Sequence, residues 1–185
     1  MPHPLDRIPP GKRLSVFIVF LILTLLSMTV MQVVGIPLKN DTATAGIISL
    51  ELAYTPAKAQ ALIASWDTHA ISRANFIQGL DFSFLVIYST TITLVCLWAG
   101  RVIRAASWPL AGLGLPLAWG QWLAAALDLL ENIALVVVLF AGVNSPWTQL
   151  AAICAVPKFA LIVLGLGYGI LGAGAWIARP AARKA

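Results

Sequence analysis

Charged residues are scarce in this chain, and their scarcity excludes most classes of soluble protein. Only 10 % of the 185 residues are Asp, Glu, Lys or Arg, whereas 60 % are hydrophobic. A soluble domain carries about 25 % charged residues. Together with a mean hydropathy of +0.90, this composition indicates an integral membrane protein. The length suits one compact bundle and not two domains.

Cysteine and histidine are also rare, which removes the commonest metal and haem sites. Cys96 and Cys154 lie in apolar stretches without the spacing of a zinc site or a disulfide framework, so we interpret both as small hydrophobic residues. His3 and His69 fall in the N-terminal tail and a long loop, so we expect no haem held by two histidines inside a bundle. The sequence patterns of serine hydrolases, zinc proteases and di-iron desaturases are missing as well. We therefore predict no metal or cofactor.

Four apolar runs are long enough to cross a bilayer, which requires about 20 helical residues. They cover residues 14–36, 80–100, 117–141 and 149–177. We predict an all-α integral membrane four-helix bundle in which residues 1–185 form a single membrane domain. The first run exceeds the apolar region of a signal peptide, about 7–15 residues, so we expect an uncleaved helix. The proline-rich, basic segment before it is predicted to be a disordered cytoplasmic tail.

The chain has a formal net charge of +5, but the distribution of this charge does not favour nucleic-acid binding. Lys and Arg occur in short clusters beside apolar runs, where they set the orientation of membrane helices. Only Lys39, Lys58 and Arg73 fall on the predicted outer side. The positive-inside rule then places both termini in the cytoplasm and the chain in the inner (plasma) membrane as a multi-pass protein. The basic residues on the predicted cytoplasmic side are Arg7, Lys12, Arg13, Arg101, Arg104, Arg179, Arg183 and Lys184.

Residues 37–79 connect the first two runs and are predicted to form an ordered, partly helical extracytoplasmic cap. Thr55-Pro56 is a typical helix start, because a hydroxyl can cap the helix and proline fits its first position. Trp66 suits a membrane interface. The stretch 47–54 is apolar apart from a serine and Glu51, and we expect it to pack on the rim of the bundle.

Charged residues inside the last two apolar runs indicate a polar site within the membrane. An ionised side chain at mid-bilayer costs at least ~2.5–3.5 kcal/mol on insertion scales, so such groups pair, face a wet cavity or hold a proton. Asp128, Glu131 and Asn132 are three and four residues apart and share one helix face. Lys158 shares a face with Gly165-x-x-x-Gly169, which allows close helix packing. We therefore predict that Lys158 points towards the two carboxylates.

Two residues of the second run complete the predicted pocket. Asp81 lies near the outer end of that run, and Tyr88 lies below it on the same helix face. With every acid ionised, the site would have a formal charge of −2, so we expect one carboxylate to pair with the lysine. Another would hold a proton, unless a cation or a water file is present. The predicted ligand or proton pocket comprises Asp81, Tyr88, Asp128, Glu131, Asn132 and Lys158.

Three classes of function fit these residues. The favoured one is binding of a membrane lipid or small amphiphilic ligand, or proton-coupled transport, in a pocket under the cap. The second is an accessory subunit of a larger membrane complex or a homo-oligomer, in which the polar network only fixes helix packing. The third is a membrane enzyme that uses a buried carboxylate as general acid and base on a lipid-like substrate. The sequence leaves ligand and oligomeric state open.

Three motifs together resemble a family of uncharacterised bacterial four-span membrane proteins. They are Asp81-Phe82-x-Phe84 followed by Tyr88, then Asp128-x-x-Glu131-Asn132, then Lys158. The resemblance covers most of the chain from about Glu51 onward and implies a four-span fold but no activity. The sterol-isomerase-like emopamil-binding group is similar in helix number and buried carboxylates, but its intramembrane catalytic histidine has no counterpart here.

Overall fold

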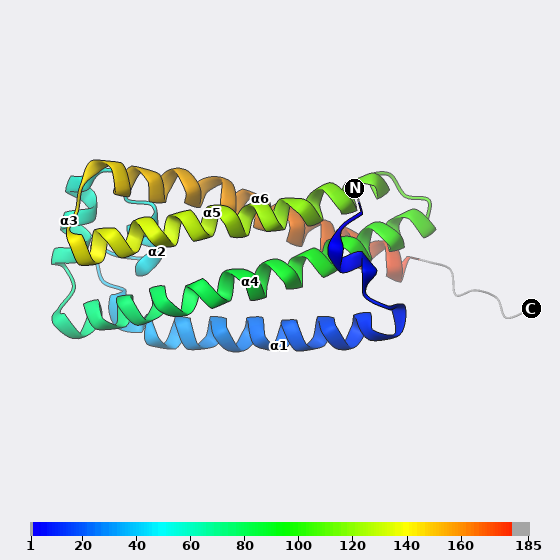
Figure 1. Ribbon diagram of the computed structural model, residues 1–185, viewed down its shortest axis with the longest axis horizontal. Helices are drawn as coiled ribbons and strands as arrows, with labels where there is room; N and C mark the ends of the chain where they lie inside the picture. Colours follow the sequence, from blue (N-terminus) through cyan, green and yellow to red (C-terminus); the bar gives the residue numbers. More distant parts are fainter. Residues whose placement is uncertain (1, 179–185) are drawn as a thin grey trace, which may run out of the picture.

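The computed structural model describes residues 2–178, and all of the regular secondary structure in that range is helical. Within these residues four helices are long and apolar enough to cross a membrane. They are α1 (Pro10–Val34), α4 (Thr68–Ala105), α5 (Gly114–Ala141) and α6 (Ser145–Ile177) (Figure 1). The prediction of an all-helical membrane protein is confirmed.

Short helices connect the long ones and mark the two ends of the molecule. The start of α1, the end of α6 and the turn between α4 and α5 lie at one end, here named the α4–α5 end (Figure 1). The opposite end, named the α2–α3 end, carries α2, α3 and the turn between α5 and α6 (Figure 1). The short elements are η1 (Pro4–Arg7), η2 (Ile36–Leu38), α2 (Ile47–Glu51), α3 (Pro56–Ala64) and η3 (Ala111–Leu113). Three residues used to predict topology, Arg179, Arg183 and Lys184, lie outside the described residues.

The four long helices are not packed equally. Helices α4, α5 and α6 pack closely on one another, whereas α1 packs mainly on α4. Thr24 is the one buried residue of α1, and its hydroxyl lies 2.8 Å from the hydroxyl of Thr91 on α4. The fold is therefore a three-helix core with α1 attached along one side.

Small residues allow α6 to lie close to the other core helices. A Cβ atom added at Gly165 would lie 2.5 Å from Nε2 of Gln121 on α5, and one at Gly172 would lie 2.8 Å from the Cα of Ala99 on α4. Neither position can take a larger residue without a shift of its neighbours. This packing turns the face of α6 that also carries Lys158 towards the core.

Helix α4 begins at Thr68, well before residue 80, where the second apolar run begins. The Asp67 side chain caps the helix by accepting a hydrogen bond from the Ala70 N–H at 2.7 Å. The first turns bury Ala70, Ala74 and Ile77 and expose Ser72 and Arg73 between them. The hydropathy pattern missed these turns because they are amphipathic, whereas residues 82–100 contain no charged residue.

The prediction of a disordered N-terminal tail is also wrong for its described part. Asp6 forms an ion pair with Arg101 of α4, with a nitrogen-to-oxygen distance of 3.0 Å. The buried His3 ring lies 4.7 Å, between ring centroids, from both Trp119 and Trp122 of α5. These contacts fold the tail back against the α4–α5 end.

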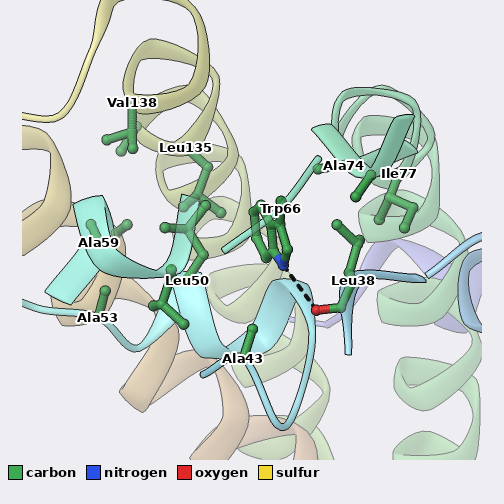
Figure 2. Packing of buried hydrophobic residues seen from close by; sticks show 14 residues of the cluster. Leu38, Ala43, Leu50, Ala53, Ala59, Trp66, Ala74, Ile77, Leu135 and Val138 are labelled. Atoms are coloured by element: carbon green, nitrogen blue, oxygen red, sulfur yellow. Dashed lines mark hydrogen bonds between the residues drawn. The ribbon is translucent and has the colours of Figure 1, made fainter. Parts of the chain in front are cut away.

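An apolar cluster fixes α2 and α3 to the core helices at the α2–α3 end (Figure 2). The indole N–H of Trp66 donates a hydrogen bond to the Leu38 carbonyl oxygen at 2.9 Å inside this cluster. Trp66 is only 5 % exposed, so its predicted place at the membrane interface is wrong. Leu50 belongs to the same cluster, and its burial fixes the position of the next residue, Glu51. The full cluster contains Leu38, Ala43, Leu50, Ala53, Ala59, Leu62, Trp66, Ala70, Ala74, Ile77, Ala134, Leu135, Val138 and Ala151.

Candidate functional site

Lys158 is the centre of a buried cluster of charged side chains. Its Nζ atom lies 2.7 Å from a carboxylate oxygen of Glu131 and 3.0 Å from one of Asp128. A third carboxylate oxygen, from Glu51, lies 3.8 Å away. No side chain of these four residues is more than 9 % exposed. We name Glu51, Asp128, Glu131 and Lys158 the Lys158 cluster.

The packing of α5 against α6 explains why these groups meet. Asp128 and Glu131 are three residues apart on α5, so their side chains leave the same face of that helix. Lys158 leaves the face of α6 that packs against α5. An ammonium group has three N–H donors, so one lysine can serve several carboxylate oxygens at once. The contact between Lys158 and the α5 carboxylates follows from the helical spacing in the sequence.

Glu51 is the member of the cluster that the predicted site lacked. It ends the short helix α2 and is buried, 7 % exposed. Burial raises the pKa of the Glu51 carboxyl above its ordinary value, and the nearby Lys158 ammonium offsets part of that rise. A single carboxylate within the apolar stretch 47–54 was the available signal. Sequence alone does not show that this stretch folds onto the core, so Glu51 is absent from the predicted site.

Asn132 occupies a second polar contact beside the cluster. Its side-chain oxygen accepts a hydrogen bond from the amide of Gln78 on α4, and both side chains are buried. The predicted pocket does not contain Gln78. This residue lies three positions before Asp81, in the segment 37–79 that was predicted to form the cap.

Asp81 and Tyr88 lie on α4, one and three turns beyond Gln78 in the helix. Among the described residues, Asp81 forms no ion pair with a nitrogen within 4 Å. The Tyr88 hydroxyl is buried and makes no hydrogen bond to any of residues 2–178. The structure therefore brings Asp128, Glu131 and Lys158 into contact and leaves these two polar groups outside that contact.

A pocket of about 490 Å³ adjoins both groups. We name it the lateral pocket, because α1 and α6 form its two sides with α4 between them and α2 at one end. Most of the lining from α1 and α6 is apolar and includes Leu21, Leu25, Met28, Ile162 and Leu166, although Thr24 and Gln32 of α1 are polar. We name the part of the lining that contains the buried acids and the lysine the base of the pocket: Glu51, Asp81, Tyr88, Asp128 and Lys158.

The residues of the site do not define a known class of metal or enzyme centre. No three His, Cys, Asp or Glu side chains in the described part of the chain are arranged to hold a metal ion. Comparison with family models, with curated proteins and with solved structures gave no match. The fold and the site define the class: an all-helical protein with four membrane-length helices and buried charged residues.

Proposed function

We propose that the protein binds an amphiphilic ligand in the lateral pocket. The polar end of the ligand lies at the base, beside the Lys158 cluster and Asp81, and its apolar chain lies between α1 and α6. One observation supports this proposal above the others: the same pocket is lined by large apolar side chains of α1 and α6 and by buried charged residues. Its volume of about 490 Å³ is within the range of about 300–1,000 Å³ that is common for small-molecule sites.

A purely structural role of the charges would not require this pocket. The contacts of Lys158 with Asp128 and Glu131 already join α5 to α6, as polar side chains do between many membrane helices. Asp81 and Tyr88 add nothing to that joint, yet both are buried beside the cavity. The Tyr88 hydroxyl has no hydrogen-bond partner among residues 2–178, and Asp81 has no cation of the described chain within 4 Å. Both situations are costly in a buried place, and a ligand group at the base would relieve them.

The test is native mass spectrometry of the purified protein, in which a bound lipid or small amphiphile appears as an added mass. Ile162→Trp fills the side of the pocket and should abolish the added mass. Val163→Trp is the matched control, because the neighbouring Val163 is 66 % exposed and outside the pocket lining. Val163→Trp should retain the ligand. Absence of any added mass in the wild type, or equal binding by both variants, would overturn the proposal and favour an accessory role in a larger membrane complex.

Proton coupling is a second candidate, and the excess of carboxyl groups favours it. Glu51, Asp81, Asp128 and Glu131 surround or adjoin one lysine, which gives a formal charge of −3 if every acid is ionised. A low-dielectric site disfavours such an excess of one charge, so protons or a cationic ligand must compensate for it. In proteoliposomes with a pH-sensitive dye inside, wild type should carry protons along an imposed gradient and Glu131→Gln should not. Equal fluxes would refute coupling.

The proposed setting of either function is the plasma membrane, with the α4–α5 end in the cytoplasm. Arg7, Lys12, Arg13, Arg101 and Arg104 gather at that end of the molecule, as the positive-inside rule requires of a cytoplasmic side. The lateral pocket and the Lys158 cluster would then lie towards the outer half of the bilayer, beneath α2.

A further inference from the structure

We infer that the ligand has a cationic ammonium head group, and that this group binds between Asp81, Phe84 and Tyr88 on α4. The inference rests on the proposed function, since it names the class of amphiphile that the lateral pocket takes. Three independent features of the pocket favour a cation: an uncompensated carboxylate, an unpartnered hydroxyl group and a pair of aromatic rings.

Asp81 is the carboxylate of the pocket that lacks a cationic partner. Glu51 and Asp128 also line the pocket, but both lie within 4 Å of the Lys158 ammonium. Asp81 forms no such contact among the described residues, although it is only 9 % exposed. Lys39 also lines the pocket, but its side chain is exposed and forms no ion pair within 4 Å among the described residues. A carboxylate buried without a cation is costly, so a ligand ammonium group at Asp81 stabilises both partners.

Tyr88 supplies the second feature. The residue is 5 % exposed and lines the pocket, and its hydroxyl has no hydrogen-bond partner among residues 2–178. Asp81 and Asp128 are its acidic neighbours. The hydroxyl oxygen can accept a hydrogen bond from a primary ammonium group while its own hydrogen is directed at a carboxylate, so Tyr88 and Asp81 can both accept from such a group.

The rings of Phe84 and Tyr88 supply the third feature. Their centroids are 5.2 Å apart with an interplanar angle of 49°, and both residues line the pocket. Asp81, Phe84 and Tyr88 follow one another at intervals of three and four residues, so they occupy one face of α4. Aromatic rings attract ammonium groups through the negative potential of their faces, most strongly where water is excluded. A carboxylate beside two such rings therefore favours an ammonium group over a neutral head group.

An anionic head group fits the same place poorly. It would lie beside Asp81 and Asp128, and repulsion between like charges is strong at low dielectric. The one buried lysine is already shared among three carboxylates, which leaves it little attraction for a fourth anion. The apolar sides from α1 and α6 continue away from this point and can accept the alkyl chain.

The test compares three amphiphiles of equal chain length: an alkylammonium, a neutral alkyl glucoside and an alkyl sulfate. Binding to the purified protein in a neutral detergent is measured by native mass spectrometry and by titration calorimetry. Wild type should bind the alkylammonium roughly tenfold more tightly than the glucoside, and the sulfate least well. Asp81→Asn should remove that preference. Asp41→Asn is the control, because Asp41 is exposed and outside the pocket.

Phe84→Leu is a second variant, which keeps an apolar side chain and removes one ring. It tests the ammonium site independently if Asp81→Asn does not fold. It should also weaken alkylammonium binding while glucoside binding stays unchanged. Organic extracts of the purified wild type then identify the source: an amino-phospholipid contains phosphate, and a free cationic amphiphile does not. Either source supports the inference.

The outcomes separate this inference from the proposed function. If all three amphiphiles bind equally well and neither variant changes the order, the ammonium site is refuted while ligand binding in the pocket stands. If none of them binds, and Ile162→Trp behaves as Val163→Trp does, both proposals fail together.

Discussion

Removal of the buried lysine should destabilise the fold far more than removal of an exposed one. In Lys158→Met, the carboxylates of Asp128 and Glu131 lose an ammonium at 3.0 and 2.7 Å. At these distances, with an effective dielectric constant of about 20, each attraction is roughly 6 kcal/mol before desolvation is subtracted. Both side chains are almost fully buried, so water cannot replace the lost partner. We expect a net loss of about 3–5 kcal/mol in the free energy of unfolding.

Reversible unfolding by SDS in mixed micelles, followed by tryptophan fluorescence, measures this loss. Lys58→Met is the matched control, because Lys58 is exposed on α3, and it should change the free energy of unfolding by less than about 0.5 kcal/mol. Addition of Asp128→Asn and Glu131→Gln to Lys158→Met should restore at least about 2 kcal/mol, since the two carboxylates closest to the lost ammonium are then neutral and only the more distant Glu51 of the cluster lacks its partner. A loss below about 1 kcal/mol, or no recovery in the triple variant, would refute the charge-pairing argument.

Three further predictions use the same unfolding assay. Because burial raises the pKa of Glu51, the folded state binds that proton more tightly than the unfolded state does. As the pH rises from the ordinary carboxyl range through the raised pKa, the free energy of unfolding of wild type should therefore fall relative to that of Glu51→Gln. A constant difference in the free energy of unfolding between about pH 4 and pH 9 would contradict this. A double-mutant cycle of Thr24→Val and Thr91→Val should give a coupling of about 0.6 kcal/mol, and zero coupling would show that the contact does not hold α1. Trp66→Phe should destabilise by about 1 kcal/mol through its lost hydrogen bond, whereas the exposed Trp176→Phe should not.

The membrane helices could be predicted because bilayer thickness imposes a length on apolar runs. The first, third and fourth helices start a little before the apolar runs that predict them, and they end close to the same residues. The second helix differs because Thr68–Gly79 is amphipathic: Ser72 and Arg73 are exposed, whereas Ala70, Ala74 and Ile77 face the core. An average over hydropathy cannot separate such turns from a polar loop, but a test of helical periodicity can.

The part of the site that lies on long helices could also be predicted. Helical spacing places Asp128 beside Glu131. Because a buried charge without a partner is costly, Lys158 is expected to lie next to these two carboxylates. Glu51 could not be assigned, since its position depends on the packing of Trp66 and Leu50 at the α2–α3 end. That packing joins residues far apart in the chain, and no local pattern encodes it.

The lateral pocket depends on how α1 packs, and the sequence of α1 has no apolar face from which that packing could be predicted. This helix is apolar on all sides and exposes most of its large side chains, so no single stripe of residues indicates which helices it contacts. It rests mainly on α4, held in its middle by the Thr24–Thr91 contact, and its other side borders the pocket. No residue of α1 belongs to the Lys158 cluster, which α2, α5 and α6 form. The apolar lining that α1 adds to the pocket is therefore separate from the ion pairs at the base, and the two could only be brought together by a packing that no local pattern predicts.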